Sequence, residues 1–448
     1  MAQKPFNEIA IELNEPLLEG DGILYSMLSE TGKRAFFPSR GILGQSAEAK
    51  GASINATIGT AFEEDGSPMR LECLSRLLNM DPSVFLYAPS SGVKALREKW
   101  QDILRRKNAD VPVNFRMSLP VVSNAITHAL WLAGQLFVEK GDKVIIPDLY
   151  WDNYDLLFRD GRGAKFVTFK TFTDTKHDFD YEVGKFNIAA MKKALLKPGE
   201  KKILLLNFPN NPTGYTPTYT ESFHIAEAIR EAAEAGKKIV VLIDDAYFGL
   251  VYEKGIARHS LFPLLGDLHE NVLAVKLDGA TKEDYVWGFR VGFITFARKG
   301  STIEQMRSLE QKAAGLVRGS ISNVSNLSQR LLLKAYETGD DYLEQKALRF
   351  TTLARRYRKI RSILNEHREY KKSFTAMPFN SGYFMCVKAK GIDAESVRRH
   401  LIEKYDTGTI VVSGLLRIAF SSVPYEKLDR LFANIDAAVR DLTKPKGE

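Results

Sequence analysis

The sequence is poor in the residues that cross-link small domains or bind metals. It has two cysteines and seven histidines among 448 residues. Cys73 and Cys386 lie far apart among apolar residues, which argues against a disulfide framework or a zinc site. The histidines lack the HExxH spacing of zinc enzymes, so we expect no bound metal. So few cysteines also favour a reducing compartment, and we expect a cytoplasmic protein.

Long hydrophobic segments and several common motifs are missing as well. The longest purely aliphatic run covers residues 239–243, whereas a membrane-spanning helix needs about 20 apolar residues. Polar residues follow Met1 to Pro5 in place of the apolar core of a secretory signal. No GxxxxGK(S/T) or GxSxG motif occurs, and Gly161-Arg162-Gly163 lacks the third glycine of a dinucleotide fingerprint. We therefore expect neither a membrane segment nor a secretory leader.

The charge is weighted toward the basic side. Lys and Arg number 63 against 55 Asp and Glu, for a net charge of +8. This balance permits binding to nucleic acid or other anions but specifies none. The densest basic run, residues 355–361, is predicted to be helical, where such charges usually spread over a solvated face. A separate DNA-binding domain has little room in the residues before Ile54, so we expect no nucleic-acid partner.

Short aliphatic runs alternate with amphipathic stretches through the middle of the chain. We predict buried strands at residues 143–146, 203–206, 239–243 and 272–276. Thr218 and Glu221 form a capping box for one intervening helix, and Asn124 is expected to cap another that ends near Glu139. The alternation predicts an α/β fold, with a mostly parallel central sheet and helices on both faces.

The last third of the chain follows a different pattern. We expect a long helix, a strand, a helix, a strand and a final helix, near residues 342–369, 382–388, 394–404, 415–421 and from Tyr425. This pattern predicts a large domain over residues 71–330 and a smaller α+β domain formed by residues 1–70 with 331–448.

Polar or aromatic residues follow each of the four predicted strands. They are Trp151 after the first strand, Asn211 after the second, Asp244 and Tyr247 after the third, and Lys282 after the fourth. In open α/β sheets ligands bind beyond the carboxyl ends of the strands, so we expect these side chains to share one crevice. A turn or a helix cap explains each cluster alone, but not their joint order.

Three motifs in this set carry a resemblance to a known family. They are Asn211-Pro212-Thr213-Gly214, Asp244-x-Ala246-Tyr247, and Lys282 followed eight residues later by Arg290. With them the sequence resembles the fold-type I aminotransferases that use pyridoxal 5′-phosphate (PLP), in particular the aspartate aminotransferase group. The resemblance implies a PLP enzyme that moves an amino group between an amino acid and a 2-oxo acid.

The resemblance implies roles for two charged residues in that chemistry. Lys282 is similar to the lysine that forms a Schiff base with PLP, and Asp244, rather than Asp245, to the carboxylate that pairs with the pyridinium nitrogen. A partly desolvated lysine beside cations loses its proton readily, which suits nucleophilic attack and proton transfer. The alternative for Lys282 is an exposed loop lysine beside Glu283 and Asp284.

Other contacts to the cofactor ring are implied in the same way. Asn211 and Tyr247 would bond to the phenolate oxygen of the ring. Trp151 resembles the aromatic residue that stacks on the ring, with Tyr150 as the alternative, although aromatic residues there could equally pack in the core.

The implied phosphate site combines a helix start with an arginine. Arg290 would bind the phosphate bidentately, and Ala125, Ile126 and Thr127 resemble the phosphate cradle at a helix N-terminus. The chain departs from the family there, because Ala and Ile stand where Gly or Ser is usual. Gly279 likewise stands where the family often has a phosphate-binding serine.

The substrate contacts are implied by residues near both ends of the chain. Arg417 lies in an otherwise apolar strand and resembles the arginine that holds the substrate α-carboxylate, and Asn211 is implied as a further substrate contact. Gly59 belongs to a segment similar to the one that closes over the substrate. A buried structural ion pair is the alternative for Arg417.

Two further residues imply a homodimer with shared sites. Tyr87 resembles the tyrosine that reaches the phosphate of the neighbouring subunit, and Arg318 the arginine that recognises a dicarboxylate side chain across the dimer. With Arg318 in that role, aspartate or glutamate is the expected substrate; otherwise neutral or aromatic amino acids are. Decarboxylation or elimination on the same fold would use the same cofactor contacts and stays open.

Overall fold

Within the part of the chain that the computed structural model describes, seven strands form one central sheet in the order β2-β8-β7-β6-β5-β3-β4. The described residues are 7–18, 25, 26, 28, 30–34, 41–77, 79–111, 115–173 and 185–443. The strands are β2 Val121–Asn124, β3 Lys143–Pro147, β4 Lys165–Phe169, β5 Lys201–Asn207, β6 Lys238–Asp244, β7 Val272–Gly279 and β8 Val291–Ala297. The four strands expected from aliphatic runs are β3, β5, β6 and β7, which confirms them and the fold class.

The sheet is parallel from β4 to β7, and β8 runs antiparallel to both of its neighbours, β7 and β2. Only a loop and a short 3₁₀ turn, Trp287–Phe289, separate β7 from β8. The chain therefore reverses directly, whereas a parallel connection needs a longer crossover. Lys282 lies in this reversal, at the carboxyl end of β7.

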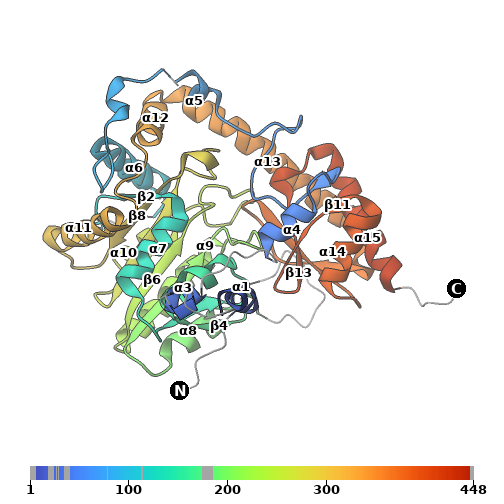
Figure 1. Ribbon diagram of the computed structural model, residues 1–448, viewed down its shortest axis with the longest axis horizontal. Helices are drawn as coiled ribbons and strands as arrows, with labels where there is room; N and C mark the ends of the chain where they lie inside the picture. Colours follow the sequence, from blue (N-terminus) through green and yellow to red (C-terminus); the bar gives the residue numbers. More distant parts are fainter. Residues whose placement is uncertain are drawn as a thin grey trace.

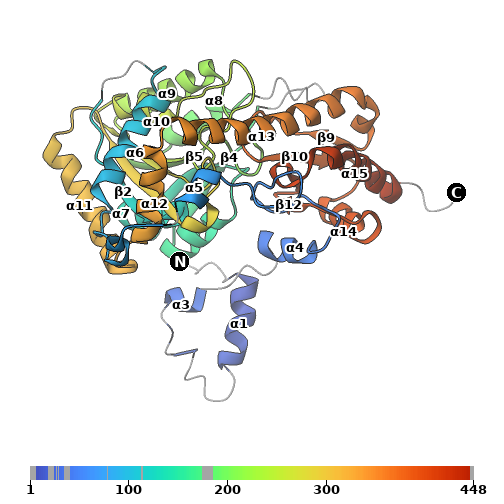
Figure 2. The same ribbon diagram turned by 90° about the horizontal axis from the view of Figure 1, so that it is seen from above.

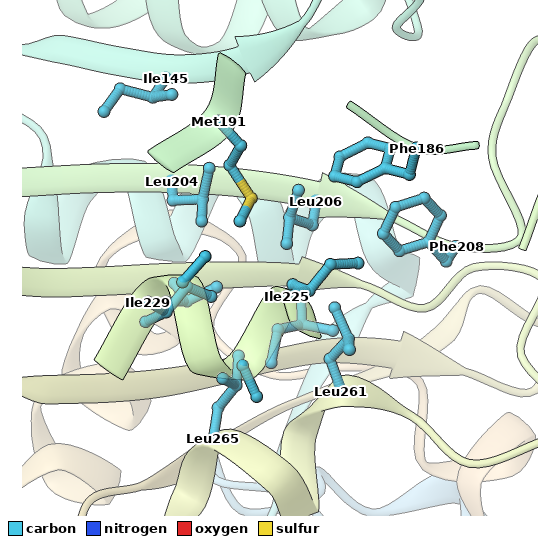
Figure 3. Close-up of a cluster of buried hydrophobic side chains, with 14 of the residues drawn as sticks. Ile145, Phe186, Met191, Leu204, Leu206, Phe208, Ile225, Ile229, Leu261 and Leu265 are labelled. Carbon is cyan, nitrogen blue, oxygen red and sulfur yellow. The ribbon is translucent and has the colours of Figure 1, made fainter. Parts of the chain in front are cut away.

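Neighbouring residues of the central strands face opposite sides of the sheet, and both sides are buried. Leu204 and Leu206 of β5 pack in one cluster, whereas Ile203 and Leu205 pack in another. Figure 3 shows the first cluster, where side chains of β3 and β5 meet those of α8 (Ile188–Leu196), α9 (Tyr219–Glu234) and α10 (Leu261–Gly266). α7 (Ala125–Phe137) and α11 (Ile303–Ser320) supply side chains to the cluster on the other face.

The two expected helix starts differ in outcome. The capping box at α9 is confirmed, since the Thr218 hydroxyl accepts from the Glu221 N–H and the Glu221 side chain accepts from the Thr218 N–H. Asn124 precedes α7, but its side chain makes no capping hydrogen bond; its N–H instead donates to His128 Nδ1 at 3.1 Å. The helix also ends at Phe137, before the expected Glu139.

A four-stranded antiparallel sheet, in the order β12-β13-β10-β9, forms the second part of the described structure. Its strands and main helices are β9 Phe374–Ala376, β10 Phe384–Ala389, β12 Ile410–Val412, β13 Leu415–Ala419, α13 Asp340–Glu366, α14 Ala394–Tyr405 and α15 Leu428–Thr443. β1 (Ile54–Asn55) pairs with β11 (Thr407–Gly408), so an N-terminal segment joins this part. Figure 2 shows α13 extending from the side of α12 (Asn326–Glu337) to this sheet.

Five further α-helices belong to the described residues (Figure 1). They are α1 Glu8–Leu18, α3 Glu30–Arg34, α4 Ile42–Glu48, α5 Glu72–Arg76 and α6 Lys94–Lys107. α1 and α3 stand away from both sheets in Figure 2. Among the described helices, none is long and apolar enough to cross a membrane.

The basic run on α13 forms only part of the solvated face expected from its sequence, since Arg355 and Arg358 are exposed but other cations of the run pair within the chain. Arg356 is fully buried, and its guanidinium donates to Phe62 O, Ser421 O and the Glu64 carboxylate at 2.6–3.2 Å. Lys359 pairs with Asp429 at 2.9 Å. Arg356 and Lys359 therefore stabilise contacts within the chain, so the charge density of the run reflects internal pairing as well as exposure.

Candidate active site

A cavity of about 370 Å³ lies beyond the carboxyl ends of β5, β6 and β7. Most of the residues predicted from the sequence line it: Gly59, Ala125, Ile126, Thr127, Trp151, Asn211, Asp244, Tyr247, Lys282, Arg290 and Arg417. Ile42, Thr60, Tyr154, Asn207, Ala246, Thr281, Trp287 and Phe384 complete the lining. The crevice expected from the strand ends is therefore present, and β13 and the segment after β1 also contribute to it.

Lys282 directs its amine into this cavity. Its Nζ donates to the Gly59 carbonyl at 3.2 Å and lies 5.5 Å from the ring centre of Tyr247. Burial, together with the positive charges of Arg290 and Arg417, lowers the pKa of Lys282 to about 8. Its amine therefore loses a proton much more readily than that of an exposed lysine, and it can act as a nucleophile or as a base near neutral pH.

The two residues after Lys282 are not solvated, so the exposed-loop alternative for this lysine is wrong. The side chains of Glu283 and Asp284 are 11% and 1% exposed, and both pair with Lys346 of α13. The Lys282 carbonyl accepts a hydrogen bond from the Tyr383 hydroxyl at 2.6 Å. The loop is thus held on the side opposite to the cavity.

Asp244 ends β6 and presents a buried carboxylate at the bottom of the cavity. The Tyr154 hydroxyl donates to Asp244 Oδ2 at 2.6 Å, and the Ala246 N–H donates to Oδ1 at 3.0 Å. Burial raises the pKa of Asp244 to about 6, although these hydrogen bonds oppose that shift. Asp245 does not line the cavity, because its carboxylate pairs with buried Lys276 and accepts from the Ser260 hydroxyl.

Arg417 lies on β13 with its side chain almost fully buried. Its Nη1 donates to Asn211 Oδ1 at 3.1 Å and its Nη2 to Thr57 O at 3.0 Å, while its Nε has no hydrogen-bond partner. No acidic side chain of the described residues forms an ion pair with Arg417, so the buried ion pair considered from the sequence is not formed. A buried guanidinium with spare donors suits a carboxylate ligand.

Anion-binding groups meet in the cavity at the start of α7. The first N–H groups of a helix lack partners within it, and they attract anions. Ala125 begins α7 in a left-handed conformation, with φ of 61°, and its N–H donates to Arg290 O at 3.1 Å. The exposed Arg290 side chain lines the same end of the cavity and donates to Trp287 O at 3.2 Å.

The glycine found in place of the usual serine has a steric cause. A Cβ on Gly279 would lie 2.8 Å from Gly292 Cα and 2.8 Å from Val291 O, so no side chain fits there. Thr281 and Trp287 line the cavity, and the Thr281 hydroxyl and the Trp287 indole N–H are buried without a hydrogen-bond partner among the described residues. Two buried donors without partners, beside an arginine and a helix start, fit the phosphate of PLP.

Several lining residues were not expected from the sequence. Thr281 adjoins Lys282 and could have been noticed as a hydroxyl at a strand end, whereas Trp287 and Ile42 carry no such signal. Tyr154 could have been noticed only as the last residue of the motif that contains Trp151. Tyr150, the alternative stacking residue, does not line the cavity; its hydroxyl donates to Asp155 at 3.2 Å.

Two predicted residues, Tyr87 and Arg318, lie outside the cavity of their own chain. The Tyr87 side chain is 90% exposed. Arg318 is also exposed, and its Nη1 donates to the Ser322 hydroxyl at 2.6 Å. Both residues were expected to act on the neighbouring subunit of a dimer. Their positions in a single chain do not test this role, which stays a prediction.

No group of three or more His, Cys, Asp or Glu side chains is placed to hold a metal among the described residues. The cavity itself is lined by an amine, a buried carboxylate and two arginines, with Thr281 and Trp287 among the other lining residues.

Comparison with characterised proteins agrees with this arrangement of residues. The family model for aminotransferase class I and II matches residues 64–435. An aspartate aminotransferase of Bacillus sp. (strain YM-2) is 25% identical over 259 residues. A probable N-acetyl-LL-diaminopimelate aminotransferase of Bacillus subtilis (strain 168) is 26% identical over 262 residues. In both alignments the chain spans 58% of the length of its relative, and 58% of its own.

Solved structures share the fold over almost the whole chain. An aminotransferase from Anaerococcus prevotii DSM 20548 superposes with a TM-score of 0.80 at 24% identity, covering 92% of this chain and 98% of its own. Aspartate aminotransferase from Thermus thermophilus with maleate has a TM-score of 0.73 at 18% identity, covering 92% and 99%. The chain therefore belongs to the aminotransferase class I and II family, whose members use PLP.

Proposed function

We propose that this chain is a PLP-dependent aminotransferase that moves an amino group between an amino acid and a 2-oxo acid. One observation carries the proposal: three complementary groups face one cavity. They are the amine of Lys282 with its lowered pKa, the buried Asp244 carboxylate and the Arg417 guanidinium, which has no acidic partner among the described residues. Lys282 matches the amine that bonds to the cofactor, Asp244 the partner of the cofactor's ring nitrogen, and Arg417 the binding site for a substrate carboxylate.

The cavity residues fit the parts of PLP. The start of α7, Thr281 and Arg290 would hold the phosphate, and Trp151 would cover one face of the ring. Asp244 would pair with the ring nitrogen, and the Tyr154 hydroxyl keeps the carboxylate oriented for that contact. PLP, when bound, withdraws electrons from the substrate Cα and so makes its proton easier to remove.

The chain's own residues then orient the substrate and move the proton. Arg417 would bind the α-carboxylate through its guanidinium, in the cavity that Lys282 also lines. The Lys282 amine takes the Cα proton and delivers it, because its lowered pKa lets it accept and release protons near neutral pH. The Gly59 carbonyl holds this amine at the cavity wall between transfers.

We propose aspartate or glutamate as the amino donor and a homodimer as the active form. Support comes from Arg318, an exposed arginine outside its own cavity, and from Tyr87, an exposed aromatic side chain. One relative is named for aspartate, which agrees with an acidic donor, and another for N-acetyl-LL-diaminopimelate. We also propose a cytoplasmic location, supported by the unpaired, buried Cys73 and Cys386.

Absorbance and product analysis test this proposal together. Purified protein with PLP should show a visible absorbance band that borohydride removes. The reduction should leave the cofactor covalently attached to Lys282, and Lys282→Ala should carry no such adduct. A panel of amino donors should then yield 2-oxo acids, with acidic donors turned over fastest and Arg318→Ala losing that preference. Absence of bound PLP contradicts the enzyme proposal, and release of CO₂ or an eliminated group identifies a decarboxylase or lyase instead.

A further inference from the structure

Two buried acidic residues behind Lys282 have no part in the proposed chemistry. Glu283 and Asp284 do not line the cavity, although Lys282 directly before them does. All three lie in the turn formed by residues 280–285, after β7. Successive side chains of this turn therefore serve opposite sides, the cavity on one and a cluster of helices on the other.

The helices supply a dense set of donors to these carboxylates. Asp284 accepts from the Tyr336 hydroxyl at 2.8 Å and from the Tyr342 hydroxyl at 2.6 Å. Lys346 Nζ bonds to Glu283 at 2.8 Å and to Asp284 at 2.9 Å, so it contacts both acids at once. Lys107 of α6 completes the pairing of Glu283. The turn is thereby connected to α6, α12 and α13.

Close packing leaves this turn little freedom. Gly249 adopts φ of +95° against the Glu283 carboxylate, and a Cβ there would lie 2.3 Å from Glu283 Oε1. On the next residue toward the cavity, the Tyr383 hydroxyl fixes the Lys282 carbonyl at 2.6 Å. A shift of either acid would therefore move the backbone that carries the Lys282 side chain.

Such a cluster is a costly way to obtain stability alone. Ion pairs that are buried lose hydration, and well-packed apolar residues of similar size often stabilise a fold as well or better. What charged hydrogen bonds add is one defined geometry. We propose that Lys346, acting through Glu283 and Asp284, is a positioning residue that holds Lys282 for cofactor capture and proton transfer. This inference rests on the proposed function.

Replacing Lys346 tests the inference against a matched lysine of the same helix. Lys346→Met removes both bonds to the turn. Lys359 is also on α13, and Lys359→Met removes its pair with half-exposed Asp429 of α15. Cofactor-free protein is mixed with PLP, quenched with borohydride at set times, and the labelled Lys282 peptide is quantified by mass spectrometry. We expect labelling about tenfold slower in Lys346→Met and unchanged in Lys359→Met, because misplacement of a reacting group by about 1 Å costs up to about a hundredfold in rate.

Steady-state kinetics supply a second readout that general destabilisation would not reproduce. Lys346→Met should lower kcat with little change in KM for the donor, since Arg417 lies on another element, and Lys346→Arg should restore part of the loss. Tyr342→Phe, which removes a single hydroxyl donor to Asp284, should slow labelling in the same direction and serves if Lys346→Met does not fold.

The outcomes separate this inference from the proposed function. If wild-type Lys282 is not labelled by PLP, the proposed function fails. If the wild type is labelled, and Lys346→Met and Tyr342→Phe are labelled as fast as the wild type, the positioning role is wrong. Equal slowing in Lys346→Met and Lys359→Met also overturns it, because that result shows a general loss of structure.

Discussion

The ionisable groups of Lys282 and Asp244 depart from their ordinary pKa values in a way that suits the site. Burial disfavours the charged form of both, so the lysine pKa falls to about 8 and the aspartate pKa rises to about 6. Arg290 and Arg417 lower the lysine pKa further, whereas hydrogen bonds keep the shift of Asp244 moderate. At neutral pH the chain thus holds a carboxylate that is mostly ionised and an amine that deprotonates easily.

The lowered lysine pKa predicts how cofactor capture depends on pH. Only the neutral amine attacks an aldehyde, so labelling of Lys282 by PLP and borohydride should rise about tenfold from pH 7 to pH 9 and then level off. An amine with the ordinary pKa of 10.5 would keep gaining rate beyond pH 9. The initial rate of labelling across this range, with Lys282→Ala as the blank, decides between the two profiles.

Thr281 provides a test of the phosphate end of the cavity. Its buried hydroxyl has no hydrogen-bond partner in the part of the chain that the structure describes, so we expect it to donate to the phosphate of PLP. Thr281→Val keeps the shape and should weaken PLP binding about tenfold to a hundredfold, whereas Thr281→Ser should stay near the wild type. The dissociation constant of PLP, measured by fluorescence titration, distinguishes the variants, and equal affinity in Thr281→Val would contradict the assignment.

Restoring the serine common in the family at position 279 should harm this chain. The new Cβ would meet backbone atoms of Val291 and Gly292 at 2.8 Å, which cannot yield as a flexible side chain would. We expect Gly279→Ser to lose about 2 kcal/mol of unfolding free energy without gaining PLP affinity. Gly288→Ser is the control, since its Cβ would meet no atom within 4 Å. Urea titration of both variants measures the difference, and unchanged stability in Gly279→Ser would refute the steric explanation.

At the scale of elements, sequence reasoning found the strands that are aliphatic and buried on both faces. It located β3, β5, β6 and β7 because each is a short aliphatic run, and the alternation of such runs with amphipathic stretches is the signal. β8 follows the Lys282 turn without a helix, so the alternation fails there and this strand was not predicted. β4 lies at the edge of the sheet, with two of its five residues exposed and two only partly buried, which weakens its hydrophobic pattern.

The same limit applies to the candidate site. Polar residues at the ends of consecutive strands were predictable, because parallel strands bring their carboxyl ends to one edge. The pairing of Arg356 with the backbone of Phe62 was not, since nothing local in a basic run tells which side chain is buried. Contacts between distant segments depend on the packing of α13 over the segment that follows β1, which no short pattern encodes.

Arg356 shows how much one buried cation on α13 contributes. Its guanidinium holds Phe62 O, Ser421 O and the Glu64 carboxylate, so it fastens the segment that follows Gly59 and Thr60 at the cavity. Arg356→Met would leave the Phe62 carbonyl without its donor and remove one of the two donors to Ser421 O, which also accepts from the Phe62 N–H at 3.1 Å. The loss of these buried, charged hydrogen bonds should cost about 2–4 kcal/mol of unfolding free energy. Arg358→Met, an exposed arginine of the same helix, should change it by less than about 0.5 kcal/mol. Thermal unfolding of the two variants checks this, and equal shifts would mean that the buried contacts carry little weight.

At the scale of the whole molecule, the two sheets suggest how the chain divides. We propose a large domain over residues 71–330 and a smaller one formed by residues 331–448 with 1–70. The pairing of β1 with β11 supports assigning the N-terminal segment to the smaller domain. α13 contacts the Lys282 turn through Lys346 and the second sheet's cluster through Ile360 and Ile363, so it is shared between them.

An exposed apolar surface supports association of two chains. Phe85, Leu86 and Tyr87 follow one another with 89%, 69% and 90% of their surfaces exposed. Three large apolar side chains in a row are a common sign of an interaction site. A two-fold dimer through this region would place Tyr87 of one chain near the other chain, as the proposed shared site requires.

Mixing two inactive variants tests whether the sites are shared. Lys282→Ala lacks the amine and Arg318→Ala lacks the proposed side-chain contact, so each homodimer should turn over aspartate poorly. After the subunits are mixed and allowed to exchange, half of the dimers are hybrids, and each hybrid has one site with both residues intact if Arg318 acts across the dimer. Aspartate turnover should then recover to about a quarter of the wild-type value.

Lys282→Ala mixed with Arg417→Ala is the control, because both residues line the cavity of one chain and no hybrid site regains both. Recovery in the control pair, or none in the test pair, would show that Arg318 does not serve the neighbouring site.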